Sequence, residues 1–105
     1  MEHNKLVRDR IPEIIEKSGR IAVTRVLCDT EYARCLEAKL DEEVAEFHRD
    51  QSIEELADIL EVVLALCSLK GYTEKDLEAA YRKKHELRGG FEQKIYLVRT
   101  EEDHV

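Results

Sequence analysis

The chain has 105 residues, of which 43% are hydrophobic and 39% charged, with one proline, four glycines and no tryptophan. This length corresponds to a single domain over residues 1–105, and the composition favours helices and argues against a β-sandwich or a disordered chain. The net charge of −7 makes the chain a poor non-specific binder of nucleic acid polymers or anionic membranes.

The apolar patterning contains no segment typical of a membrane span or a secretion signal. The longest apolar run, Val62 to Cys67, has six residues, and the first five residues lack the apolar region of a signal peptide. The three cysteines are odd in number and form no CxxC pair, which favours free thiols. We therefore expect a cytoplasmic protein without a membrane partner.

The first predicted helix covers residues 9–17. Asp9 is a capping residue, Pro12 is tolerated in a first turn, and Gly19 follows where a helix ends. Residues 20–28 are rich in β-branched side chains and predict an extended segment, as do residues 94–99. These two extended segments are candidates for a small two-stranded ribbon.

Three longer helices follow. The second, from residue 29 or 30 to about residue 49, is predicted by apolar residues at helical spacing, namely Tyr32, Leu36, Leu40, Val44 and Phe47. The third begins at a capping box, Ser52 with Glu55, and continues to residue 70 before Gly71. The fourth covers residues 73–88 and ends at a glycine pair. The sequence therefore predicts an all-α, four-helix domain.

The third helix is apolar around nearly its whole circumference. Such a helix requires burial on all sides. Three other helices from one small chain offer limited cover, which suggests that a second subunit of a homodimer or homotetramer supplies the rest.

Two acidic pairs occupy neighbouring helices at i, i+3 spacing, Glu43 with Glu46 and Glu55 with Asp58. Residues three apart share a helix face, where carboxylates repel one another unless a cation lies between them. Each glutamate could instead belong to a solvated face, and Glu55 could serve only the capping box. Asp58 is more informative because it is flanked by apolar residues, and burying an unpaired carboxylate is costly. A metal or a basic partner is therefore favoured there.

If the two helices are antiparallel, the four carboxylates can surround one space. Hard oxygen ligands suit Mg²⁺, with Mn²⁺ as a substitute, and Mg²⁺ held in this way commonly binds phosphate oxygens as well. The sequence contains neither a P-loop nor a dinucleotide-binding glycine motif.

At these residues the chain resembles a known superfamily. The pattern Glu42-Glu43-x-x-Glu46 followed by Glu55-x-x-Asp58 is similar to the EExxE…ExxD signature of MazG-like all-α nucleoside triphosphate pyrophosphohydrolases, relatives of phosphoribosyl-ATP pyrophosphohydrolase and of the dimeric dUTPases. The opening residues 4–12 and the closing Lys84-x-x-x-Arg88-Gly-Gly-Phe91 resemble a small-protein branch. Only eight residues separate Glu46 from Glu55, fewer than in many members, which predicts a tight connection.

Basic residues complete the predicted site. Lys84 and Arg88 continue the apolar face of the fourth helix, either to contact substrate phosphates or to extend their charged ends into water above a buried stem. Lys5 and Arg8 are further phosphate-binding candidates that rest mainly on the resemblance. Glu42 is an additional metal ligand or the general base that orients water.

The prediction is a metal-dependent enzyme that cleaves a nucleoside triphosphate to a monophosphate and pyrophosphate. Mg²⁺ would be held by Glu43, Glu46, Glu55 and Asp58, with Glu42 and Glu43 in catalytic roles. The resemblance further implies a house-cleaning role against non-standard nucleotides. The alternatives are a hydrolase of the phosphoribosyl-ATP type and a non-catalytic helical oligomerisation module in which Asp58 pairs with Lys or Arg. The base, the sugar and the number of metal ions remain open.

Overall fold

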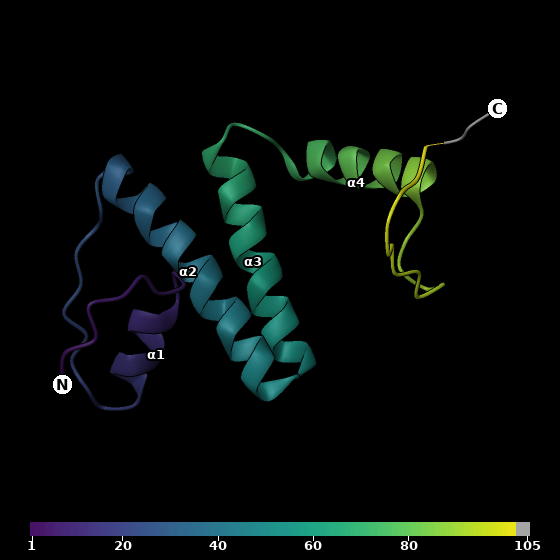
Figure 1. Ribbon diagram of the computed structural model, residues 1–105. Coiled ribbons are helices and arrows are strands. Elements are labelled where there is room, and N and C mark those ends of the chain that lie inside the picture. The colour runs from purple at the N-terminus through teal and green to yellow at the C-terminus, as the bar shows by residue number, and fades with distance from the viewer. Residues whose placement is uncertain (103–105) are drawn as a thin grey trace. The chain divides into compact units, whose positions relative to one another are not determined.

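The computed structural model describes residues 1–102 and contains four helices in this range, which confirms the all-α prediction (Figure 1). The helices are α1 (Ile11–Lys17), α2 (Asp29–Asp50), α3 (Ile53–Leu69) and α4 (Glu74–Arg88). The chain forms two compact units, one comprising Met1–Glu74 and one beginning at Lys75. Helices α1 to α3 belong to the first unit and nearly all of α4 to the second.

Helix α1 begins two residues later than predicted. Its N-cap is Arg10, not Asp9, and no side chain caps it; the single proline lies in the first turn. A turn in which the Ile11 N–H donates to the Arg8 carbonyl, at 3.0 Å, precedes the helix. The proline therefore determines the start more than the acidic residue does, because its fixed φ suits a first turn and it needs no acceptor.

Helices α2 and α3 form an antiparallel hairpin and lie side by side (Figure 1). The connection is short because Gln51 adopts a left-handed conformation, with φ of 55°, and Ser52 caps the next helix. The Ser52 hydroxyl accepts a hydrogen bond from the Glu55 N–H at 3.4 Å. The predicted tight connection is thus confirmed, and it brings the last two turns of α2 beside the first two turns of α3.

The centre of the hairpin is small. Leu36 on α2 and Val62 on α3 are the buried apolar side chains of the described residues, whereas Ile53 and Leu60 of α3 are 76% and 54% exposed. Within its own unit α3 packs against α2, and apolar side chains on its other sides stay exposed. The prediction that α3 needs a further partner to bury this surface therefore stands for this unit. At the far end of α3, Gly71 takes a φ of +85° and donates to the Ser68 carbonyl, as its place after the helix predicts.

The prediction of a small ribbon from residues 20–28 and 94–99 is wrong for this structure, since residues 1–102 contain no strand. Ile21, Val23 and Val26 are 87% to 96% exposed. β-Branched residues favour strands because they fit a pleated, half-buried surface, and a strand also needs a neighbour for its backbone hydrogen bonds. Neither segment has such a surface here.

No helix within residues 1–102 combines the length and the apolar character that crossing a bilayer requires.

Candidate metal centre at the α2–α3 turn

The structure brings the four predicted carboxylates together. Glu43 and Glu46 come from the end of α2, and Glu55 and Asp58 come from the start of α3. One carboxylate oxygen from each lies within 4.8 Å of the others. The i, i+3 spacing places each pair on one helix face, and the antiparallel hairpin turns the two faces toward each other.

Glu43 is the most buried member of the cluster, with a relative exposure of 6%. Within the described residues, its Oε2 and the Oε2 of Glu55 are buried atoms without a hydrogen-bond partner. Buried polar atoms are nearly always paired, so two orphan carboxylate oxygens in one cluster fit a site whose remaining partner is a cation. The all-oxygen donor set fits Mg²⁺ or Mn²⁺.

The electrostatics of the cluster agree with this geometry. Burial and the neighbouring Glu46 raise the pKa of Glu43, against the opposing effect of Lys39. Burial, followed by the charges of Glu46, Asp50 and Asp58, raises the pKa of Glu55. The site thus holds more negative charge than its neighbours neutralise, and a divalent cation would lower its free energy.

Asp58 differs from the prediction in its environment. Its side chain is 39% exposed, and its Oδ1 accepts a hydrogen bond from Arg8 Nη2 at 2.8 Å. The structure therefore gives Asp58 a basic partner, one of the two kinds that the sequence favoured. It does not bury Asp58 as its apolar neighbours suggested, and the most buried carboxylate of the cluster is that of Glu43. The physical reason is that α2 covers one side of α3, which leaves the flanking apolar residues at the rim of the hairpin.

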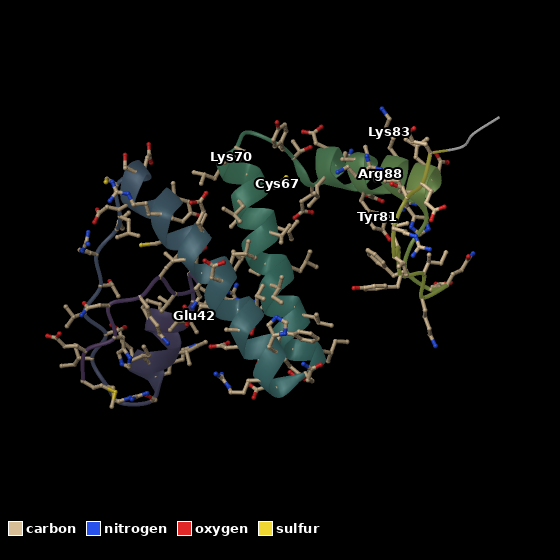
Figure 2. The ribbon with its side chains drawn as sticks, viewed as in Figure 1. Glu42, Cys67, Lys70, Tyr81, Lys83 and Arg88 are labelled. Carbon is tan, nitrogen blue, oxygen red and sulfur yellow. The ribbon has the colours of Figure 1, made fainter. Side chains whose placement is uncertain are left out.

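The sequence interpretation missed one charged neighbour of the cluster. Lys39 Nζ lies 3.4 Å from carboxylate oxygens of both Glu42 and Glu43, and its side chain is 18% exposed. The signal was present, because Lys39 precedes these glutamates by three and four residues on one helix. Glu42, labelled in Figure 2, is outside the four-carboxylate cluster and pairs with this lysine.

The basic candidates have different positions. Arg8 reaches the cluster through Asp58, while Lys5 is exposed in the irregular segment before α1. Lys84 and Arg88 are exposed on α4, in the second unit of the chain. Arg88 is labelled in Figure 2. Their predicted phosphate contacts stay predictions.

Comparisons with known proteins agree with the resemblance noted in the sequence. A family model described as dUTPase matches residues 9–94. A protein of uncharacterized function from Mycolicibacterium smegmatis is 57% identical over 54 residues, which cover 48% of this chain and 55% of that relative. The chain therefore spans about half the length of this relative. No solved structure matches the chain significantly.

Proposed function

The chain belongs to the dUTPase family of MazG-like all-α nucleoside triphosphate pyrophosphohydrolases, and from this premise we propose that it is a divalent-metal-dependent hydrolase that converts a nucleoside triphosphate to a monophosphate and pyrophosphate. The observation that supports the proposal is the buried Glu43 carboxylate, whose unpaired Oε2 lies in a cluster of four carboxylates. A helical module without a ligand would gain nothing from this costly arrangement.

Glu43, Glu46, Glu55 and Asp58 would hold the cation. A divalent cation at that position supplies positive charge to phosphate oxygens and lowers the pKa of water. Lys39 orients the Glu43 carboxylate through its contact at 3.4 Å. Glu42 is 40% exposed and next to the cluster, which makes it the candidate base for accepting a proton from the attacking water.

Positive side chains would complete the substrate site. Arg8, Lys5, Lys84 and Arg88 are candidates for the phosphate oxygens, and an arginine can hold two of them at once. Water would attack the α-phosphorus, and pyrophosphate would leave. Positioning and electrostatic stabilisation would supply most of the rate acceleration.

The substrate class is open to direct measurement. We propose a house-cleaning role, and deoxyuridine triphosphate is the first nucleotide to assay because of the description of the matching family. A screen for released pyrophosphate should cover standard and damaged nucleotides, with Mg²⁺ and with Mn²⁺. Phosphoribosyl-ATP belongs in the same screen, because activity with it alone would favour the alternative hydrolase.

Asp58→Asn tests the metal site. The amide is nearly the same size but lacks the charge, so we expect turnover to be abolished. Because the Arg8–Asp58 pair is partly exposed, its loss should cost at most about 1 kcal/mol of folding free energy. Activity and thermal unfolding should be measured on the same preparation. A variant with normal Mg²⁺-dependent activity would contradict the assignment.

A further inference from the structure

One side chain from the N-terminal segment reaches the candidate metal centre. Arg8 precedes α1, and its carbonyl accepts the hydrogen bond from the Ile11 N–H that begins the helix. Its guanidinium lies 2.8 Å from Asp58 Oδ1, across 50 residues of sequence. Among residues 1–102, Asp58 is the side-chain partner of Arg8, and most of the five guanidinium N–H donors are free for another partner.

The two cations at the cluster are attached in different ways. Lys39 lies on α2 itself, one turn before Glu43, and its stem is largely buried. Arg8 comes from an irregular segment, and its side chain is 53% exposed. Arg8 can therefore rotate away from the cluster at little cost, whereas Lys39 is part of the hairpin.

The position of Arg8 has an electrostatic consequence. Four carboxylates with these two cations leave a formal charge of −2 at the cluster. The guanidinium occupies a position around the Asp58 carboxylate from which that carboxylate could bind a metal ion. It also places a positive charge beside the site of the cation. Both effects weaken the binding of a divalent ion.

We propose that Arg8 is an internal counter-ion that competes with the divalent cation for Asp58, and that it transfers to a phosphate group when the nucleotide binds. A phosphate offers the guanidinium a bidentate partner, and departure of Arg8 frees Asp58 for the metal. Metal and nucleotide then strengthen each other's binding, and the coupling acts equally in both directions. This inference rests on the proposed function, since it takes the four carboxylates as the metal site.

The test begins with calorimetric titration of Mn²⁺ alone into the full-length chain and its variants. We expect Arg8→Ala to bind Mn²⁺ about three- to tenfold more tightly than the unmodified chain. Arg25→Ala is the matched control, because Arg25 forms a partly exposed pair with Glu31. Glu31 precedes Glu43 by twelve residues, or about 18 Å along α2, so this control should leave the affinity unchanged.

A second titration includes an α,β-imido analogue of deoxyuridine triphosphate, which resists the proposed cleavage. Chelation of Mn²⁺ by the free analogue is the same in each experiment and cancels in the comparison. Because Arg8 would then contact phosphate, the advantage of Arg8→Ala should disappear or reverse. Thermal unfolding of each variant verifies that it is folded.

The outcomes separate this inference from the proposed function. If Mn²⁺ binds the unmodified chain but Arg8→Ala binds it equally or more weakly, the competition is overturned and Arg8 instead positions Asp58 as a ligand. If the advantage of Arg8→Ala persists with the analogue, the transfer to phosphate is overturned. If neither protein binds Mn²⁺, the proposed metal site fails, and this inference fails with it.

Discussion

At the scale of single residues, the burial of Glu43 creates a conflict between stability and the proposed function. Its carboxylate is 6% exposed and has an unpaired Oε2. Glu43→Gln keeps the shape and removes the charge, so we expect a higher melting temperature for the metal-free protein. The same change should weaken Mn²⁺ binding by more than about tenfold, since a full charge next to a divalent ion is lost.

Glu37→Gln provides the control, because Glu37 lies exposed on the same helix, outside the cluster. It should change neither the melting temperature nor the affinity appreciably. A Glu43→Gln protein with lower stability and normal Mn²⁺ binding would contradict the prediction.

The raised pKa values of Glu43 and Glu55 predict how stability depends on pH. The folded-state pKa of each group lies above its unfolded value of about 4.5. Between these two pKa values the folded protein therefore binds more protons than the unfolded chain. Metal-free stability should therefore rise as the pH falls from neutral toward about 4.5. With saturating Mg²⁺ the trend should reverse, because protonation then displaces the ion. Thermal unfolding measured over this pH range, once with EDTA and once with Mg²⁺, checks the direction of both pH trends.

At the scale of elements, the start of α2 depends on one ion pair. The Glu31 carboxylate accepts two hydrogen bonds from the Arg25 guanidinium, at 3.2 and 3.0 Å, and one from the Cys28 N–H. The Arg25 hydrogen bonds, with those of Cys28, lower the pKa of Glu31 to about 2. A lowered pKa contributes stability that is present above about 4.5 and is lost as the pH falls toward about 2.

Far-UV circular dichroism between pH 5 and pH 2 measures this contribution. We expect the loss of helical signal in this interval to be smaller in Glu31→Gln, which lacks the titrating group. Glu13→Gln is the matched control, since Glu13 forms a pair with Lys17 on a different helix. If the unmodified chain and Glu31→Gln lose helical signal identically as the pH falls, the Arg25–Glu31 pair does not stabilise the start of α2.

Helix α4 presents its basic residues without burying their stems. Lys84 and Arg88 are both exposed, and Tyr81 on the same helix is 64% exposed. If Arg88 binds phosphate, Arg88→Ala should reduce kcat/KM by at least about tenfold, because a charge-assisted hydrogen bond contributes about 1.5–3 kcal/mol. The melting temperature should change little. Arg88→Lys should restore part of the loss, since it keeps the charge without the fork.

Lys83→Ala is the control for this helix, because Lys83 is also exposed and carries no predicted role (Figure 2). Normal activity per folded molecule in Arg88→Ala, with reduced stability, would instead indicate that the arginine serves the fold.

At the scale of the whole molecule, the apolar surface of α3 predicts self-association. Ile53, Leu56 and Leu60 are between 49% and 76% exposed, although the helix is apolar around most of its circumference. We expect sedimentation at micromolar concentration to show a homodimer or a homotetramer. Leu60→Glu should shift the assembly toward monomer, whereas Glu61→Gln, at an exposed position, should leave the assembly unchanged. A well-behaved 12 kDa species would contradict this expectation.

The sequence by itself determined the helices and the cluster of carboxylates. Capping residues, glycines and apolar spacing are local signals, and they predicted α2, α3 and α4 to within about one residue. The two i, i+3 pairs and the short connection were sufficient to predict that Glu43, Glu46, Glu55 and Asp58 meet, because a tight antiparallel hairpin permits few other arrangements. Their role as metal ligands stays a prediction.

Only the tertiary structure decided which of these carboxylates is buried. Periodicity identifies the face of a helix, but it does not show how far the neighbouring helix extends over that face. Packing of α2 on α3 therefore buried Glu43 and left Asp58 at the rim. It also gave Asp58 the partner Arg8, since a contact across 50 residues depends on the path of the chain and has no local signal. For the same reason, β-branched segments that lacked a neighbouring backbone formed no ribbon within residues 1–102.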